Sequence, residues 1–448
     1  MDFFRHPVNL RNLVVGVDMK VPLSNGAFVK AINFDNAATT PPFSSVIQEI
    51  IDFSPWYSSI HRGTGYKSQF SSSLYEKSRE IVGKFVKSDP KRDTVIFVKN
   101  TTEAINKLSY RLCEDHKKCV VLSTCMEHHS NDLPWRNKYQ VDYIALDENG
   151  RLCLKDLEHK LKKYDGSTAL VTITGASNVT GYKNPIHKIA TLVHKYHAKI
   201  LVDGAQLVPH VPVNMKPWGS LEHIDYLVFS AHKMYAPFGT GVLIGPKTTF
   251  EKGDPDYVGG GTVDMVTHDY IRWSAPPHKE EAGSPNIIGV VALATAIKTL
   301  NYIDMKYVEA YENNLTSYAL QRLSNIPDIE LYGDKEHYGD RVSIIPFNIK
   351  GIPHHMVATI LSYEGGIAVR NGCFCAQPYI QNLLHIPLDE VKKRIDDPTA
   401  DHPGMVRISF GLYNTYSEID TFTNFIKRII RYKKFYLEKY KNIDPPKI

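Results

Sequence analysis

The sequence predicts an α/β protein built on a largely parallel sheet, followed by a smaller second domain. Short β-branched runs alternate with stretches of helical period, and this alternation is typical of strand–helix–strand units. A chain of 448 residues is long enough for one large core and a satellite, and from about residue 290 the pattern changes to longer helices. The runs that read as buried strands are 94–99, 119–124, 168–174, 198–204 and 225–232.

We expect the chain to fall into three parts. Residues 31–295 hold the predicted sheet, and residues 296–448 hold long helical patterns and the strand-like run RVSIIPFNI, so they should form a small C-terminal α+β domain. Residues 1–30 are expected to pack with that small domain. The basic stretch FTNFIKRIIRYKKFYLEKY near the C-terminus is most simply a helix with a solvated face.

Composition favours a small-molecule partner. The formal net charge is +5 without long blocks of one sign, so we expect no nucleic acid to bind. Charges interrupt the apolar runs of the first thirty residues, which predicts neither a signal segment nor a membrane span. Six cysteines at irregular spacing are not a disulfide framework, so we expect free thiols and a cytoplasmic protein.

Asp203 and Lys233 each stand where a predicted strand ends. Ligands of parallel sheets sit beyond the carboxyl ends of the strands, so the two side chains should face one site. A simple salt bridge would explain the pair equally well. Pyridoxal 5′-phosphate (PLP), however, needs both groups: a carboxylate keeps its pyridine nitrogen protonated, and a lysine forms a Schiff base with its aldehyde.

A phosphate cradle is predicted beside this pair. Thr101 and Thr102 stand where a strand runs into a helix, so their hydroxyls and backbone N–H groups would face an anion at a helix N-terminus. Ser230 and His232 could donate from the other side. The simpler alternative is that the threonines only cap the helix.

Further polar residues follow strand ends. An imidazole in MEHH, His128, could stack on a cofactor ring and move protons near neutral pH, although adjacent histidines are more often surface residues. Asn178 could donate to the cofactor or to a substrate carboxylate, or it could be a turn residue before a glycine.

The stretch RNGCFCAQP carries two thiols, Cys373 and Cys375. Together with His354 and His355 they lack a recognisable zinc spacing, so we expect no metal site. A glycine before and a proline after favour a loop over a buried core pair, although that alternative stays open. Cys373 could also serve as a resolving thiol for Cys375, but a disulfide between residues two apart is strained.

Ten motifs in register resemble the class V aminotransferases of the PLP-dependent transferase fold type I. Within these enzymes the chain is most similar to the cysteine desulfurases of the group that includes selenocysteine lyases. The resemblance implies a mostly parallel seven-stranded sheet, PLP as cofactor and a homodimer with shared active sites. Its motifs are FDNAATT (34–40), HRG (61–63), TTE (101–103), MEHH (126–129), SNVTG (177–181), VDGAQ (202–206), SAHKMYAPFGTGVL (230–243), GGGTV with EAGSPN (259–263, 281–286), GIAVRNGCFCAQP (366–378) and VRISFGLYNT (406–415).

Carried over to this sequence, the resemblance assigns roles to individual residues. Lys233 is the Schiff-base lysine, Asp203 the pyridinium partner and His128 the ring that stacks on the cofactor. The remaining cofactor contacts are Gln206 at the phenolic oxygen, Thr101, Thr102, Ser230 and His232 at the phosphate, and Ser284 at the phosphate of the neighbouring subunit. The substrate side comprises Ala38, His61, Asn178, Arg370 and Arg407, of which Arg407 clamps the amino-acid carboxylate.

The reaction that the resemblance implies is the conversion of L-cysteine to L-alanine, with the sulfur left as a persulfide on Cys375. Selenocysteine is a further expected substrate. Cys373 and Phe374 depart from the pattern of close relatives, and residues 379–405 form a longer segment than those relatives have. Two alternatives therefore stay open: a thiol-independent class V reaction such as transamination, epimerisation or β-elimination, and a sulfur-delivery scaffold that docks an acceptor protein.

Overall fold

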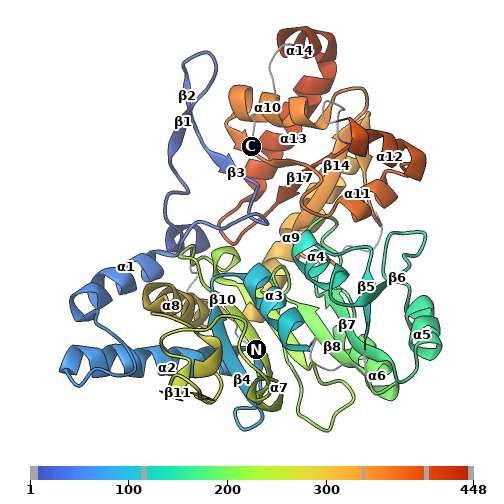
Figure 1. Ribbon diagram of the computed structural model, residues 1–448. Coiled ribbons are helices and arrows are strands. Elements are labelled where there is room, and N and C mark those ends of the chain that lie inside the picture. The colour runs from blue at the N-terminus through green and yellow to red at the C-terminus, as the bar shows by residue number, and fades with distance from the viewer. Residues whose placement is uncertain (1–8, 113–118, 335–338, 398–402, 442–448) are drawn as a thin grey trace, which may run out of the picture.

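A seven-stranded sheet forms the centre of the larger half of the molecule (Figure 1). The computed structural model describes residues 9–112, 119–334, 339–397 and 403–441. In this sheet β10 is antiparallel to both of its neighbours and the other pairs are parallel, which confirms the predicted mostly parallel arrangement. Its strands, in spatial order, are β4 (Asp93–Val98), β10 (Gly241–Pro246), β9 (Tyr226–Ser230), β8 (Lys199–Asp203), β7 (Thr168–Thr174), β5 (Val120–Thr124) and β6 (Gln140–Ile144).

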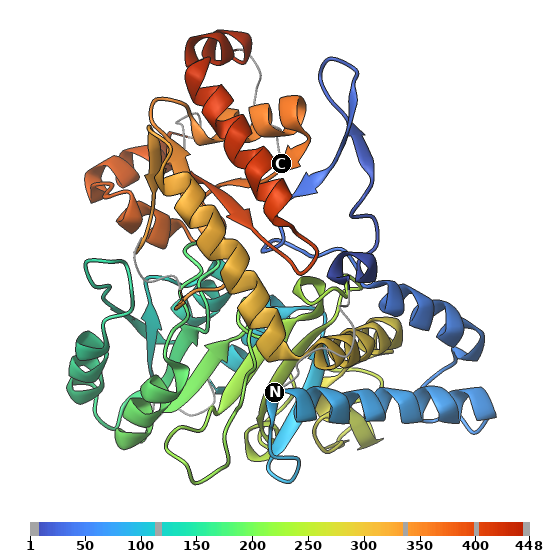
Figure 2. The same cartoon turned by 180° about the vertical axis from the view of Figure 1, so that it is seen from behind.

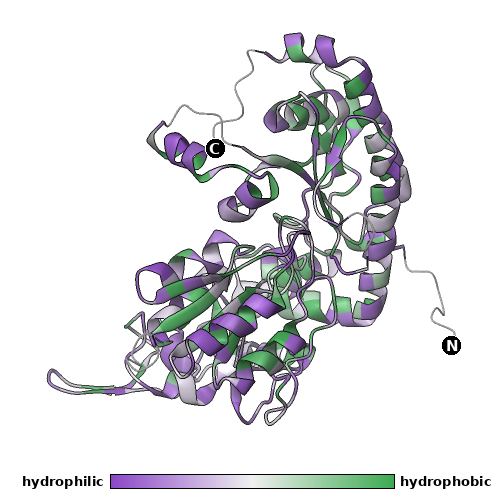
Figure 3. Cartoon of the chain, turned by 90° about the vertical axis from the view of Figure 1, so that its right-hand side faces the viewer, coloured by the Kyte–Doolittle hydropathy of each residue, from purple (hydrophilic) through white to green (hydrophobic). Residues whose placement is uncertain are grey.

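Helices cover both faces of this sheet. Successive residues of β4 alternate between two apolar cores, with Val95 and Phe97 in one and Ile96 and Val98 in the other. Apolar ribbons accordingly run through the interior in Figure 3. One core is closed by α2 (Tyr66–Val86), α5 (Leu154–Lys163), α6 (Ile186–Lys195) and α8 (Ile287–Ile303), with α1 (Ser44–Phe53) against α8, and the other by α3 (Thr101–Leu112), α4 (Leu133–Arg136) and α7 (Lys247–Glu251).

The smaller half is a four-stranded antiparallel sheet with its own core. The strand order is β13 (Ile329–Leu331), β14 (Ile344–Ile349), β17 (Met405–Ser409) and β16 (Arg370–Gly372). Thr415 and Glu418 form a reciprocal capping box at the start of one helix of this half. The helices are α10 (His354–Gly365), α11 (Gln377–Leu383), α12 (Leu388–Asp396), α13 (Tyr416–Arg431) and α14 (Lys433–Lys439).

The long helix α9 (Met305–Ser324) joins the two halves (Figure 2). Its first turns pack into the core of the large sheet and its last turns into the core of the small sheet. Near its middle, Glu312 is buried and bonds His210 of the large half (2.6 Å between Oε2 and Nδ1) and the Ser343 hydroxyl beside β14 (3.2 Å).

The N-terminal segment contacts the small half. The hairpin of β1 (Lys20–Pro22) and β2 (Phe28–Lys30) leads into β3 (Ile32–Asn33), which pairs in parallel with β15 (Ile367–Ala368). The proposed boundaries at residues 30 and 295 stay a prediction, and residue 295 lies inside α8.

Short remaining elements are the hairpin of β11 (Val263–Val266) and β12 (Ile271–Trp273) and the 3-10 turns η1 (Leu10–Leu13), η2 (Ser54–Trp56), η3 (His129–Asn131), η4 (Ala231–Lys233) and η5 (His278–Glu280).

Within the described ranges, no helix on its own combines the length and apolarity needed to cross a membrane. Among these residues, only α8 and α9 taken together have the required length and apolarity, and the two helices meet at a bend of 78°.

Candidate functional site

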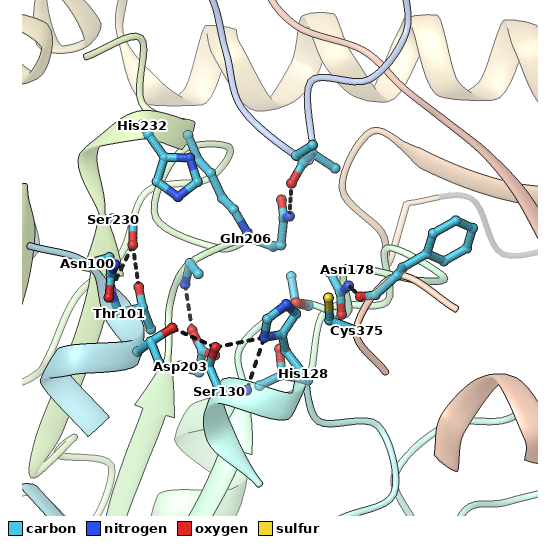
Figure 4. A pocket seen from close by; sticks show the side chains of 18 of the residues that line it. Asn100, Thr101, His128, Ser130, Asn178, Asp203, Gln206, Ser230, His232 and Cys375 are labelled. Atoms are coloured by element: carbon cyan, nitrogen blue, oxygen red, sulfur yellow. Dashed lines mark hydrogen bonds between the residues drawn. The ribbon is translucent and has the colours of Figure 1, made fainter. Parts of the chain in front are cut away.

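A cavity of about 330 Å³ lies beyond the carboxyl ends of the parallel strands, between the large and small halves. Figure 4 shows Ser230, Asn100 and Thr101 on one side of it and Asn178 and Cys375 on the other. The fold therefore brings together residues from widely separated motifs. The predicted residues that line the cavity are Ala38, Thr101, Thr102, His128, Asn178, Asp203, Gln206, Ser230, His232, Lys233, Arg370, Cys375 and Arg407.

Asp203 and Lys233 lie at the floor of this cavity. Asp203 is the last residue of β8, and Lys233 ends the turn η4 that follows β9 directly. Burial raises the pKa of the Asp203 carboxyl, while its Oδ1 accepts a hydrogen bond from the Ala205 backbone N–H (2.9 Å). Burial also lowers the pKa of Lys233 to about 8, although the charge of Asp203 opposes this shift. A lysine with this pKa is a competent nucleophile and base near neutral pH.

Hydroxyl groups and a helix N-terminus form one side of the site. Thr101 is the first residue of the twelve-residue helix α3, and its backbone N–H donates to Ser230 Oγ (2.8 Å). The Thr101 and Ser230 hydroxyls are 2.7 Å apart, as are those of Thr102 and Ser130. Such a cluster is suited to an anion such as phosphate. Ser130 was missed by the sequence analysis, although it stands in HHSN directly after the histidines.

The imidazole of His128 is held in one orientation. Its Nδ1 accepts a hydrogen bond from the Ser130 backbone N–H (3.1 Å) and lies 3.0 Å from Ser130 Oγ. Burial, together with the charges of Lys233, His129 and Arg407, lowers the pKa of His128 to about 3. The ring is therefore neutral at physiological pH, with its proton on Nε2. Burial likewise lowers the pKa of His232 to about 4.

Glu127, a residue that the sequence analysis did not select, anchors the segment that carries His128. Its carboxyl group accepts hydrogen bonds from Thr124 Oγ1 (2.6 Å), Asn131 Nδ2 (2.6 Å) and the Thr174 backbone N–H (2.9 Å). Burial raises its pKa to about 8. These bonds tie the ends of β5 and β7 to the turn that presents the imidazole.

Two arginines from the small sheet share one carboxylate. Asp35 lies 3.0 Å from Arg370 Nη2 and 3.1 Å from Arg407 Nη2, and the sequence analysis did not select it either. The guanidinium of Arg407 is 3% exposed, stacks 4.9 Å from the centre of the Phe374 ring and donates to the Asn178 carbonyl (2.9 Å). Burial lowers the pKa of Arg407 to about 10, so it still carries its charge at neutral pH. This pair forms a cationic wall suited to a carboxylate.

Cys375 lies on a tight turn that faces the cavity. Phe374 (φ 51°) and Cys375 (φ 53°) are both left-handed, a conformation that costs energy for residues other than glycine. Contacts with the large half hold the turn: Asn178 Nδ2 donates to the Phe374 carbonyl (2.7 Å), and the His129 backbone N–H donates to the Cys375 carbonyl (2.7 Å). Cys375 lines the cavity together with Lys233, Arg370 and Arg407, so its thiol shares the cavity with three basic side chains.

Two predicted residues lie outside the cavity. Ser284 is exposed and does not line it. His61 lies at the far side of α2, where its ring is 4.9 Å from that of His278. The ligand atoms of His61, Glu76 and His278 all lie within 4.8 Å of one another, although Glu76 also bonds Arg79. The substrate-side role predicted for His61 and the contact predicted between Ser284 and the phosphate of a neighbouring subunit stay predictions.

Lys233 and Asp203 form a lysine–carboxylate pair at the strand ends of a mixed seven-stranded sheet, and the two arginines of the smaller half face them across the cavity. This arrangement is typical of α/β enzymes that use an aldehyde cofactor. A model of the aminotransferase class-V family matches residues 32–422, and the chain belongs to that family.

The similar proteins include several that are named cysteine desulfurases. The chain is 34% identical over 409 residues to a probable cysteine desulfurase of Synechocystis sp. (90% of this chain, 91% of that protein) and 35% identical over 397 residues to a cysteine desulfurase of Haloferax volcanii (87% of each). The apo structure of the cysteine desulfurase of Thermococcus onnurineus superposes with a TM-score of 0.80 at 30% identity and covers 90% of this chain and 95% of that one. These matches confirm the resemblance read from the motifs.

The residues of the site fit PLP. Gln206 lines the cavity, and its Oε1 is buried without a hydrogen-bond partner among the described residues, while its Nε2 donates to the Ala37 carbonyl (2.7 Å). Lys233 Nζ likewise has neither a hydrogen bond nor an ion pair among these residues and is positioned for an aldehyde. Asp203 would hold the pyridine nitrogen, and the hydroxyls at the start of α3 would hold the phosphate.

Proposed function

We propose that this protein is a PLP-dependent cysteine desulfurase, which converts L-cysteine to L-alanine and retains the sulfur as a persulfide on Cys375. The observation that carries the proposal is an exposed thiol in the same cavity as Lys233 and the arginine pair. The names of the similar proteins support it. A thiol-independent class V reaction has no use for a strained turn that presents a cysteine to this cavity.

Arg407 and Arg370 bind the substrate carboxylate, and Asp35 holds the two guanidinium groups in place. The cofactor, when bound, withdraws electrons from the substrate Cα. Lys233, with its lowered pKa, takes the proton from Cα and returns one later. The neutral His128 lies beside the cofactor site, with its Nε2 proton available for a hydrogen bond.

Cys375 performs the sulfur transfer. Its thiolate attacks the substrate sulfur, so that an S–S bond forms while the Cβ–S bond breaks and its electron pair moves to the carbon skeleton. Cys375 lines the same cavity as Lys233 and Arg407, so its sulfur can reach a substrate held there. The products are a persulfide on Cys375 and, after protonation at carbon, alanine.

The proposal extends to the assembly. We propose a cytoplasmic homodimer in which Ser284 of each subunit reaches the phosphate site of the other, and an acceptor protein that removes the sulfur. Selenocysteine is proposed as a second substrate, because selenium is the heavier analogue of the sulfur that Cys375 attacks.

One experiment tests the activity. The purified PLP-loaded protein is given L-cysteine, and alanine and modified residues are identified by mass spectrometry. We expect alanine and a persulfide on Cys375, with both lost in Cys375→Ala and both retained in Cys119→Ser, a change to an exposed cysteine outside the cavity. Pyruvate with ammonia, a need for a keto-acid acceptor, or full activity of Cys375→Ala would refute the proposal.

A further inference from the structure

The loop that carries Cys375 separates two cavities. Phe374 and Cys375 line the large cavity that contains Lys233. Cys373 and Gln377 line a second cavity of about 160 Å³ on the other side of the loop, together with residues of α11 and α12. The two cavities share no lining residue. The chain thus presents one thiol to each cavity.

The two thiols occupy one turn. The Ala376 backbone N–H donates to the Cys373 carbonyl (2.9 Å), and the two residues between them are left-handed, as in a type I′ turn. Two residues span at most about 7 Å of chain, so the Cα atoms of Cys373 and Cys375 lie no farther apart than that. An added sulfur extends Cys375 by about 2 Å, which shortens the distance that a rearrangement of the two side chains has to cover. Burial raises the pKa of the Cys373 thiol, a hydrogen bond from the Cys375 backbone N–H opposes this shift, and a negative charge on Cys375 adds to it.

We propose that Cys373 is a second sulfur carrier, which takes the persulfide sulfur from Cys375 and presents it to the second cavity. This inference rests on the proposed desulfurase activity. An acceptor thiol would then collect sulfur on the far side of the loop, without entering the substrate cavity.

The transfer balances without a further reagent. The Cys373 thiolate attacks the outer sulfur of the Cys375 persulfide, a new S–S bond forms on Cys373, and the electron pair of the broken S–S bond stays on Cys375. The proton released from Cys373 is replaced by one on Cys375. The departing sulfur of Cys375 stays in the cavity that Lys233 and Arg407 line.

Attack on the inner sulfur is the competing reaction. It would release hydrogen sulfide and close a disulfide between Cys373 and Cys375. The span of two residues strains that disulfide, so transfer of the outer sulfur is favoured.

The test locates the sulfur after a single turnover. The PLP-loaded protein receives one equivalent of L-cysteine that carries a heavy sulfur isotope, and samples are quenched with iodoacetamide at successive times. Trypsin releases residues 371–392 as one peptide, and fragmentation between the two cysteines assigns the label. We expect label on Cys375 first and then on Cys373, with the first signal decreasing as the second rises.

Variants give the matched controls. In Cys373→Ser and Cys373→Ala the label should stay on Cys375, and in Cys375→Ser no label should reach Cys373. Cys119→Ser should behave like the unmodified protein. Label confined to Cys375 at all times would overturn the relay while leaving the desulfurase activity intact, whereas label on Cys373 in Cys375→Ser would overturn the order of the two thiols. An absence of both alanine and label would instead refute the proposed function.

Discussion

The two walls of the active cavity are built in different ways. The large-domain wall consists of strand ends and the start of a helix, where Asp203, Ser230 and Thr101 are placed by the regular elements that carry them. The small-domain wall consists of Arg407 and the Cys375 turn, which depend on bonds to Asp35, Asn178 and His129 elsewhere in the chain. The residues proposed to bind the cofactor thus lie on the large-domain wall, which regular elements make rigid. Those proposed to recognise the substrate lie on the small-domain wall, which tertiary contacts hold in place.

The largest effect is expected from Lys233→Ala on the rigid wall. Removing the proposed base and cofactor attachment should lower kcat by about 10⁴-fold or more, because residues that act as a unit leave little activity behind. Alanine formation and the visible absorbance of bound cofactor measure this effect. Lys199→Ala, at the opposite end of β8, is the control. If the Lys233→Ala variant kept either the formation of alanine or the visible absorbance of bound cofactor, the role assigned to Lys233 would be wrong.

The next effect concerns pH. An amine captures an aldehyde only in its neutral form, and that fraction rises with pH through the pKa of Lys233, which is lowered to about 8. The rate at which apo-protein takes up PLP should therefore fall about 50-fold between pH 8 and pH 6 and level off above pH 9. Stopped-flow absorbance records it. A rate that keeps rising beyond pH 10 would indicate an ordinary exposed lysine.

On the small-domain wall, Arg407→Lys should raise KM for cysteine by about 10- to 100-fold with a smaller change in kcat, because lysine cannot form the bidentate contact with a carboxylate. Arg370→Lys should have a weaker effect, since the Arg370 side chain is 44% exposed and its contacts are screened by water. Steady-state kinetics separates the two. Equal effects would contradict the different roles of the two arginines.

The smallest effect is expected from Asn178→Ala. It leaves the buried Phe374 carbonyl without its donor, which costs about 1–3 kcal/mol locally. Amide hydrogens of residues 373–377 should then exchange several-fold faster, while exchange in β8 stays unchanged. Mass-spectrometric hydrogen exchange measures both. Unchanged exchange in the turn would show that the other contacts suffice to hold it.

The same contrast decides how much the sequence could predict. Asp203 and Lys233 were found because each comes at or just after the end of a strand that a β-branched run marks in the sequence. The five buried strands predicted from such runs are confirmed. Two strands of the seven-stranded sheet were not read. The edge strand β6 is only partly buried, and the apolar run of the fully buried β10 is only three residues long and lies between glycines.

The missed site residues have a related cause. Asp35 lies within the motif FDNAATT, yet its role depends on two arginines more than 330 positions away, and no local pattern encodes that meeting. Ser130 and Glu127 stand within a few residues of His128, but the bonds that connect them to the rest of the site, to Thr102 on α3 and to Thr174 on β7, form only when these elements are assembled. Residues whose role is set by tertiary contacts are the ones that single-sequence reasoning overlooks.

Helix α9 has a mechanical consequence. Its twenty residues form a continuous rod of about 30 Å that is embedded in both cores. Because Glu312 couples this rod to His210 on one side and to Ser343 on the other, pulling the halves apart would expose a buried ionisable pair. Substrate entry should therefore proceed by rearrangement of side chains and the Cys375 turn, with the distance between Lys233 and Arg407 kept nearly constant throughout turnover.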